Sequence, residues 1–468
     1  MTYAAIVRIL SLLALLLAAG MVLCALVALA FEEYQALLGF SVTATLVSAL
    51  ALSVFFLTPK PDRPSRPRDG LAVLILWWTF APLVAVGPYL LAGPASSPLH
   101  ALHDAVSSLT TTGHAAVTFG EGGWPVSLIV WRAVLHLLGA WATLVAAASI
   151  FAAINLGGPG IHRTVLFTIP KGSFFEAVPR VTYAAALALG GVVLGMAVVL
   201  LASGAPLHRA LADAVSVATT GLVLPDRAAM APASGIEAAF LMAGLLFSTI
   251  GLAVALEVRA RRWREALSDP EGVTMAVVVL GLVGLSMWAG LPVNDAVGWS
   301  ITSLSTSGLP LADATMTRDL PLSLAVVPVI IGGSALSTAG GVKLARLAIL
   351  ASRAGQEFRY LAFRRAVRIF SFRGRVQPDR AIIGIWVYLV GYIMALALTL
   401  FAFSLAGNEF EVAVANAVGT LSNAGGLVKI VPGGQPPLAD LAAIAAMLGG
   451  RLEILAALPA FIPSFWRV

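Results

Sequence analysis

The 468-residue chain has little charge and almost no cysteine. Only 11% of its residues are Asp, Glu, Lys or Arg, whereas soluble proteins carry about 25%. Cys24 is the single cysteine, which excludes an intrachain disulfide and a cysteine metal cluster. The chain also lacks a polar stretch long enough for a soluble domain, so any nucleotide-binding module would belong to another chain.

Apolar residues are abundant instead. They make up 59% of the chain, and runs of the roughly 20 apolar residues that a membrane-spanning helix needs recur along its length. The first run, from Ile9 to Ala30, is longer than the apolar core of a signal peptide and is predicted to be a retained membrane helix. The composition therefore predicts an all-α polytopic membrane protein.

A short motif occurs four times between the long apolar segments. It reads DAVSSLTTTG at Asp104–Gly113, DAVSVATTG at Asp213–Gly221, WSITSLSTSG at Trp299–Gly308 and NAVGTLSNAG at Asn416–Gly425. Each copy is too short to cross a bilayer and ends in hydroxyl or amide residues followed by glycine. Irregular backbone survives in a membrane only where it is buried in protein or lines a water-filled cavity. We therefore expect four half-crossings that form the walls of one central pore.

The segments divide the chain into a hairpin and four helix–pore-loop–helix repeats. We predict a transmembrane hairpin at 1–58, a proline-rich cytoplasmic linker at 59–70, pore repeats at 71–155, 175–264, 272–350 and 380–468, and a basic cytoplasmic segment at 351–379. Within the repeats, continuous helices are expected at about 71–92, 126–154 and 438–462, among others.

Basic residues indicate the orientation. Most of the 29 Lys and Arg residues lie in the linker and between the repeats, which the positive-inside rule assigns to the cytoplasm. All four half-crossings then enter from the outer side, so the repeats are parallel around an axis normal to the membrane. The net charge of +6 is a topology signal and an anionic-lipid surface, and nucleic acid is not an expected partner.

The ends of the half-crossings have the composition of a cation filter. Rings of backbone carbonyls replace the water shell of an ion, and glycine permits the positive φ that lets carbonyls face an axis. We expect the four glycines to occupy the same place in each copy. Hydroxyl-rich helix packing is the alternative for any one copy. The predicted filter residues are Thr111, Thr112, Gly113, Thr219, Thr220, Gly221, Thr306, Ser307, Gly308, Ser422, Asn423, Ala424 and Gly425.

Two further features predict a gate. The segment GGSALSTAGGVK contains Gly332, Gly333, Gly340, Gly341 and Lys343 and is too glycine-rich for a continuous helix, which suits a flexible gate below the filter. A tight helix crossing is the alternative. Arg451 lies within an apolar segment, where a charge is costly and usually functional, and is expected to act as an electrostatic barrier. The alternative is that Arg451 pairs with Glu453, with Glu257 or with another carboxylate.

The sequence does not decide the roles of several polar residues near the half-crossings. His100 and His103 are three positions apart and could share a metal on one helix face, although no further His or Cys lies close in sequence. His114 follows the first filter glycine. Asp104, Asp213 and Glu411 either raise the local cation concentration or cap helices.

Four motifs together resemble the TrkH-type membrane subunits of the Trk/Ktr/HKT superfamily of potassium transporters. They are TTTG at 110–113, GGSALSTAGGVK at 332–343, LSNAGG at 421–426 and MLGGRLEILAALPAFIPSFW at 447–466. The resemblance implies four repeats around a pore, a homodimer in the bacterial plasma membrane, and potassium uptake controlled by a cytoplasmic TrkA-like ring of nucleotide-binding subunits. It also implies that 332–343 is a gating loop and that Arg451 is a pore arginine.

The same resemblance favours potassium as the transported ion. Related members with serine at the first filter glycine transport sodium, and here all four glycines are present. The chain departs from the family at His114, at Leu309 with Pro310, and at Gly426. A sodium-permeable or weakly selective transporter is one alternative, and a non-conducting ion-binding sensor is another. No nucleophile–base set predicts an enzyme, and no organic cofactor is expected.

Overall fold

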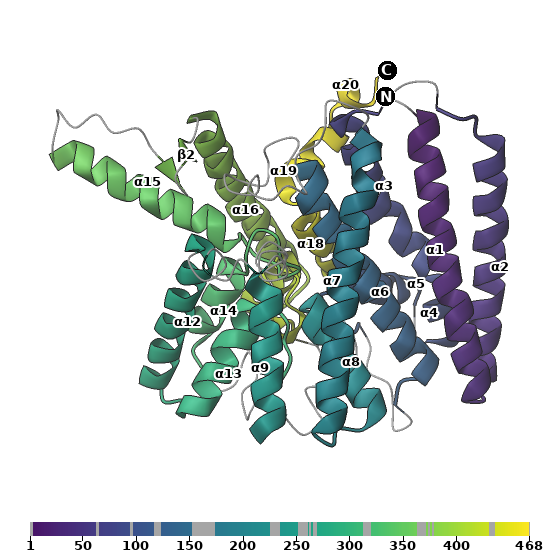
Figure 1. Ribbon diagram of the computed structural model, residues 1–468, viewed down its shortest axis with the longest axis horizontal. Helices are drawn as coiled ribbons and strands as arrows, with labels where there is room; N and C mark the ends of the chain where they lie inside the picture. Colours follow the sequence, from purple (N-terminus) through teal and green to yellow (C-terminus); the bar gives the residue numbers. More distant parts are fainter. Residues whose placement is uncertain are drawn as a thin grey trace.

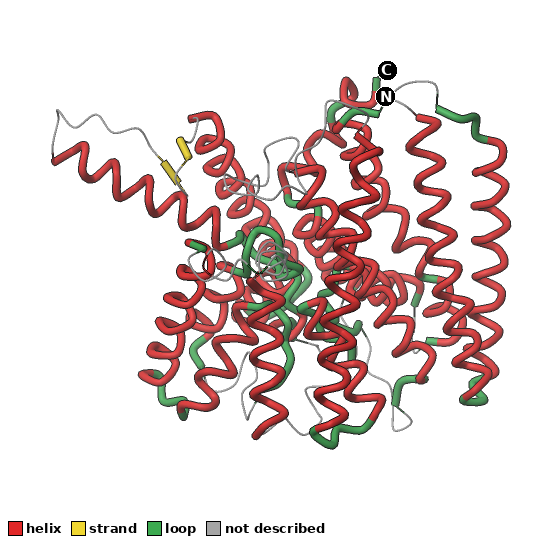
Figure 2. The backbone as a smooth tube through the Cα atoms, in the orientation of Figure 1, coloured by secondary structure: helices red, strands yellow, loops and turns green. Residues whose placement is uncertain are grey.

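The computed structural model describes residues 3–61, 65–93, 97–116, 123–151, 174–224, 235–250, 261, 264, 269–311, 320–362, 371–372, 375–376, 379–429 and 436–467. Seven helices in this part of the chain are long and apolar enough to cross a membrane. The described backbone is almost entirely helical (Figure 2). Its strands are β1 (Ser371–Phe372) and β2 (Arg375–Val376), which pair antiparallel. The predicted all-α polytopic class is confirmed.

An N-terminal hairpin lies at one edge of the molecule. Helices α1 (Tyr3–Ala30) and α2 (Tyr34–Leu57) run side by side at the right of Figure 1. The turn between them carries Glu33, whose carboxylate accepts hydrogen bonds from the backbone N–H groups of Val126 (2.6 Å) and Ser127 (3.1 Å). The hairpin is thereby attached to the first turn of the helix that begins at Val126.

Four helix, half-helix, loop, helix units follow. Their helices are, in chain order, α3 (Pro67–Ala85), α4 (Gly87–Ala92), α5 (Pro98–Leu109) and α6 (Val126–Val145); α7 (Phe174–Ala202), α8 (Leu207–Thr219) and α9 (Gly235–Ile250); α12 (Pro270–Trp288), α13 (Val293–Leu304), α14 (Leu322–Ile331) and α15 (Leu344–Ala362); and α16 (Asp379–Leu405), α17 (Phe410–Leu421) and α18 (Pro437–Arg451). The half-helices α5, α8, α13 and α17 are 12 or 13 residues long. In Figure 1, α8 and α13 lie in the lower half of the molecule, while both termini lie at the upper edge.

The start of the first repeat differs from the prediction. The linker expected at 59–70 ends early because α3 begins at Pro67, where proline costs no hydrogen bond and Asp69 accepts one from the Arg66 backbone N–H at 3.0 Å. The helix expected at 71–92 is divided at Val86 into α3 and α4.

The ends of three other helices also differ. Helix α6 changes at Ala146 into a π-helical turn, η1 (Ala146–Phe151), and residues 152–154 lie outside the described part. The helix expected at 438–462 ends at Arg451, because Glu453 has a left-handed φ of 50°; α19 (Ile454–Ala457), η6 (Leu458–Phe461) and α20 (Pro463–Trp466) follow. Helix α15 continues from the third repeat into the basic segment 351–379.

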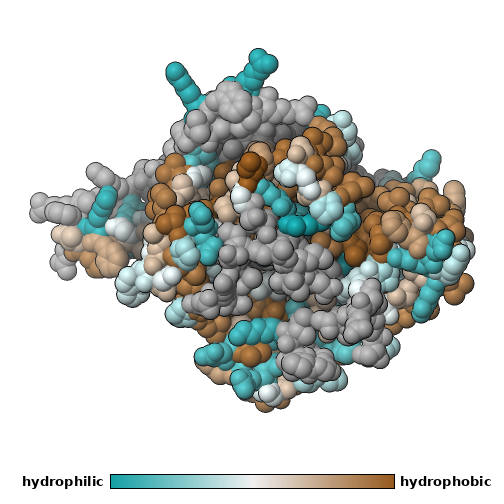
Figure 3. All heavy atoms as spheres, turned by 90° about the horizontal axis from the view of Figure 1, so that it is seen from below, coloured by the Kyte–Doolittle hydropathy of each residue, from teal (hydrophilic) through white to brown (hydrophobic). Residues whose placement is uncertain are grey.

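Burial is inverted relative to a soluble protein. Asp104, Ser107 and Thr220 are at most 1% exposed, whereas Leu280 is 71% and Trp288 is 88% exposed. The view from below shows large apolar areas on both flanks of the molecule (Figure 3). Lipid tails accept apolar side chains on the perimeter, so the polar residues gather around the centre.

Candidate functional site

The four loops predicted to form the filter pack against one another. A Cβ atom added to Gly113 would lie 2.2 Å from the Leu222 carbonyl oxygen, and one added to Gly221 would lie 2.3 Å from that of Thr111. The first two loops therefore pack backbone against backbone. The fourth loop lies against the first, because the Gly425 N–H donates to the Thr112 carbonyl at 3.1 Å. It also lies against the third, since a Cβ on Gly308 would be 2.8 Å from the Gly426 Cα.

Each loop turns at a residue that is not glycine. Thr111, Thr220, Thr306 and Asn423 follow the last turn of their half-helices with φ values of 57°, 48°, 58° and 53°. Left-handed backbone costs an ordinary residue about 1–2 kcal/mol, and strain repeated at equivalent places points to function. Within the described residues, the carbonyls of these four residues accept no hydrogen bond. The turn therefore leaves four equivalent carbonyl oxygens without a hydrogen-bond donor in the described part of the chain.

The second loop shows that the four motifs do not match glycine to glycine, as the sequence had suggested. Gly221 directly follows the left-handed residue of its loop, a place that Thr112, Ser307 and Ala424 take in the other loops. The N–H groups of Gly221, Ser307 and Ala424 all donate to the carbonyl five residues back. Leu222 therefore stands where Gly113, Gly308 and Gly425 stand, and the expected equivalence of the four glycines is wrong.

The expectation that the four glycines have positive φ is also only half right. Gly113 and Gly308 have positive φ values of 79° and 69°, whereas Gly221 and Gly425 do not. A signal for the shifted register was present in the sequence, since Asp213 and Gly221 are eight positions apart and Asp104 and Gly113 are nine apart.

Hydroxyl side chains one turn upstream brace the loops. Ser107 Oγ donates to the His114 carbonyl at 2.6 Å, and Thr302 Oγ1 donates to the Leu309 carbonyl at 2.7 Å. Ser216 Oγ accepts from the Val223 N–H at 3.1 Å. The three hydroxyls occupy one position of the repeated motif, so the half-helix itself holds the loop that follows it.

The segment 332–343 lies directly against the ring. It joins α14 to α15 without helix, as predicted, and its Gly332 and Gly341 have positive φ values of 69° and 77°. Thr338 Oγ1 lies 3.0 Å from Thr220 Oγ1, and the Gly340 N–H donates to Thr306 Oγ1 at 2.9 Å. A Cβ on Gly340 would lie 1.7 Å from the Ser422 carbonyl oxygen. The segment thus contacts the second, third and fourth loops.

Arg451 connects this segment to the first loop. Its guanidinium donates to the Thr110 carbonyl, to Thr111 Oγ1 and, at 2.6 Å, to the Thr338 carbonyl. Arg451 does not pair with Glu453, whose carboxylate pairs with Arg346. Glu257, the other proposed partner, lies outside the described residues. Lys343 stays within its own segment, where Nζ donates to the Ser337 carbonyl at 3.2 Å.

Comparison with known proteins agrees with this architecture. The family model TrkH, described as a cation transport protein, matches residues 289–467. The Trk system potassium uptake protein TrkH of Salmonella typhimurium is 28% identical over 100% of both chains, and its Halomonas elongata counterpart is 28% identical over 99% of both. The crystal structure of the potassium transporter TrkH from Vibrio parahaemolyticus covers 100% of both chains with a TM-score of 0.86 and 24% identity. The chain therefore has the fold of this transporter and is similar to TrkH proteins over its full length.

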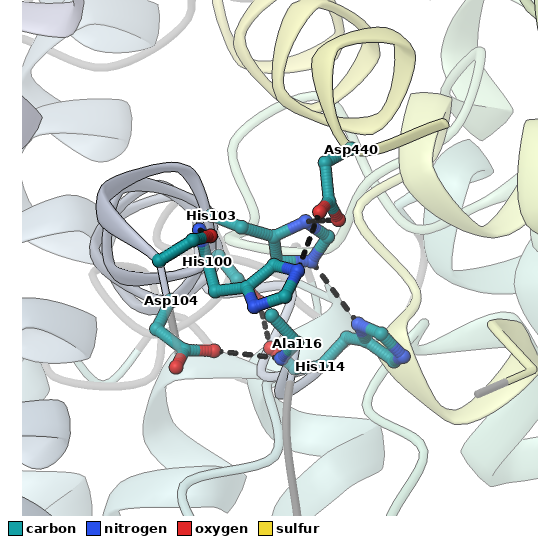
Figure 4. A network of polar contacts seen from close by, with 8 residues as sticks. His100, His103, Asp104, His114, Ala116 and Asp440 are labelled. Carbon is teal, nitrogen blue, oxygen red and sulfur yellow. Dashed lines mark hydrogen bonds and ion pairs between the residues drawn. The ribbon is translucent and has the colours of Figure 1, made fainter. Parts of the chain in front are cut away.

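Three histidines near the first loop form a network with Asp440. His100 Nε2 lies 3.2 Å from Asp440 Oδ2, and His103 Nδ1 lies 3.0 Å from Asp440 Oδ1. His103 Nε2 and His114 Nδ1 share a hydrogen bond of 3.1 Å. Figure 4 shows the three histidines converging between α5, the first loop and α18. In the described part of the chain, no group of three or more His, Cys, Asp or Glu side chains could hold a metal ion. The contacts of His103 with Asp440 and His114 tie the first loop to the fourth repeat.

Asp104 and Asp213, two of the acidic residues of the half-helices, make contacts within the protein. Asp104 Oδ1 accepts from the Ala116 N–H at 2.8 Å (Figure 4), as Asn416 Oδ1 accepts from the Lys429 N–H at 2.7 Å in the fourth repeat. Asp213 lies 3.6 Å from Arg209, and Glu411 lies exposed in the first turn of α17. The two buried acids therefore contact neighbouring protein groups, and only Glu411 faces outward.

Proposed function

We propose that this chain is the membrane subunit of a bacterial potassium uptake system and conducts K⁺ along the line where the four loops meet. The observation that carries the proposal is the ring of four free carbonyls. It is supported by the TrkH-type architecture and by the potassium uptake named in the similar proteins.

The carbonyls of Thr111, Thr220, Thr306 and Asn423 would form the central ion site. Rings of backbone carbonyls can replace the water shell of a cation, and the half-helices α5, α8, α13 and α17 end just before these residues. The C-terminal end of a helix carries partial negative charge, which favours a cation there. The next residues, Thr112, Gly221, Ser307 and Ala424, continue the wall, followed by Gly113, Gly308 and Gly425. Thr219 and Ser422 come directly before Thr220 and Asn423 in the chain.

The segment 332–343 and Arg451 would obstruct the inner end of this path. All four loops have a contact to one or the other, and Arg451 adds a positive charge beside the first loop. Helix α15 starts at Leu344, one residue after the segment, and extends beyond the bundle at the upper left of Figure 1. A cytoplasmic TrkA-like nucleotide-binding ring acting on α15 would move the segment. We also propose a homodimer in the inner membrane, K⁺ as cargo with no organic cofactor, and no enzymatic activity.

Rubidium uptake into proteoliposomes tests the function directly. We expect uptake that external K⁺ competes with strongly and Na⁺ weakly, because the carbonyl ring replaces the water shell of the larger ion. Equal competition by Na⁺ would instead favour the weakly selective transporter. Ion binding without uptake by the folded protein would favour the non-conducting sensor and contradict the proposal.

A further inference from the structure

A buried arginine stands directly behind the filter. Arg132 belongs to α6, which lies within the candidate span Val126–Ala148, and its side chain is 0% exposed. A charge in such a segment is costly and is retained where it has a specific role. The arginine appears in the sequence only as an isolated basic residue in an apolar helix, so its role depends on what the fold places around it.

The guanidinium bridges two filter loops through their carbonyl oxygens. Nη2 donates to the Gly113 carbonyl at 2.7 Å and lies 3.5 Å from the Leu222 carbonyl, and Nε donates to the Val223 carbonyl at 2.9 Å. Gly113 and Leu222 are equivalent positions of the first and second loops in the corrected register. Arg132 therefore contacts the same oxygen on two neighbouring walls of the pore.

The other two walls lack this contact. Their equivalent residues are Gly308 and Gly425, and no basic side chain in the described part of the chain donates to either carbonyl. The Gly425 carbonyl instead accepts from the Val428 N–H at 3.1 Å. At this level, two carbonyls therefore contact a charged donor and the two opposite do not.

The position of the guanidinium is defined by further contacts. Its Cζ lies 5.2 Å from the centre of the Trp124 ring. A cation over an aromatic face is attracted by the ring. This contact and the three carbonyls together define the place of the side chain.

We propose that Arg132 is a specificity-determining positioning residue, which withdraws the Gly113 and Leu222 carbonyls from the ion and sets the spacing between the first two loops. The inference rests on the proposed cation conduction. Arg132 is not itself an ion ligand and acts through the two carbonyls. Selectivity between K⁺ and Na⁺ depends on how many carbonyls reach the ion and how freely they move. Releasing two of them would supply extra, mobile oxygens that can close around the smaller Na⁺.

The test is the K⁺/Na⁺ permeability ratio, taken from reversal potentials of the purified full chain in planar bilayers. We expect R132Q to lower the ratio about tenfold with ion flux retained, because the charged donor to the Gly113 and Leu222 carbonyls is lost. R132K keeps the charge but cannot donate to both loops at once through Nη2 and Nε, so it should give an intermediate ratio. R209Q is the matched control, because Arg209 contacts Asp213 and Glu237 and no filter carbonyl. Its ratio should equal that of the unmodified protein.

A folded R132Q protein with an unchanged ratio would overturn the inference and leave the proposed function intact. Absence of K⁺ flux in the unmodified protein would instead overturn the proposed function. If R132Q does not give a monodisperse protein in size-exclusion chromatography, the R132K ratio decides: a lowered ratio supports the inference, and an unchanged ratio rejects it.

Discussion

Substitution of Gly340 by alanine tests whether the segment 332–343 closes the pore. The new Cβ would lie 1.7 Å from the Ser422 carbonyl oxygen and 2.6 Å from its carbon. A carbon and a carbonyl oxygen normally approach no closer than about 3.3 Å, so the segment must withdraw from the fourth loop by roughly 1.5 Å. Such a shift breaks the hydrogen bond from the Gly340 N–H to Thr306 Oγ1 and the contact between Thr338 and Thr220.

The free energy of these two hydrogen bonds sets the expected effect. Each contributes about 1 kcal/mol, and a total of about 2 kcal/mol shifts the equilibrium between the closed and withdrawn segment about 30-fold. We expect G340A to raise basal rubidium uptake into proteoliposomes by about that factor in the absence of any regulatory partner. The K⁺/Na⁺ preference should persist, because the left-handed turns of the four loops remain.

Gly281→Ala is the matched control, since a Cβ at Gly281 on α12 meets nothing within 4 Å. Uptake by G281A should match that of the unmodified protein. Unchanged uptake by a folded G340A protein would refute the reasoning that this segment limits conduction. Raised uptake with lost K⁺ preference would also refute it, because the substitution would then have damaged the filter instead of opening a gate.

Three other substitutions have defined outcomes. Gly113→Ser places a Cβ 2.2 Å from the Leu222 carbonyl at a φ of 79°, so K⁺ preference in competition assays should fall about tenfold; an unchanged preference would argue against a filter at this position. Arg451→Gln removes the charge beside the first loop and should raise basal rubidium uptake about tenfold, whereas uptake at the unmodified rate would show that the arginine is no barrier. Gly450→Ala places a Cβ 2.1 Å from the Leu421 carbonyl and should lower stability by about 2 kcal/mol. The adjacent Gly449→Ala meets nothing within 4 Å, so equal thermal unfolding temperatures for the two variants would contradict this account of the packing between α17 and α18.

The pattern of consecutive residues was sufficient to predict the architecture. Apolar runs of spanning length predicted the long helices, and the motif that ends in Gly113, Gly221, Gly308 and Gly425 predicted four half-crossings. The glycine-rich segment 332–343 predicted the break between α14 and α15. These features depend on the composition of consecutive residues, because the bilayer sets the length of an apolar helix and glycine weakens a helix wherever it occurs.

Predictions that needed partners distant in the chain were incomplete. The two histidines proposed as a metal pair contact Asp440, more than 330 positions away. The alternative that paired Arg451 with Glu453, two positions along, is wrong, since Arg451 reaches Thr110 and Thr111, separated from it by 341 and 340 positions. Nothing in the neighbourhood of either residue along the chain identifies such a contact.

The sequence by itself determined the class of protein, the number of half-crossings and the place of the helix break. Only the tertiary structure decided the shifted place of Gly221, the four threonine and asparagine turns at positive φ, and the clamp of Arg132 on two loops. The physical reason is that helices form from local hydrogen bonds and apolar length, whereas a ring of carbonyls exists only after four separate chain segments have packed against one another and fixed each other's backbone.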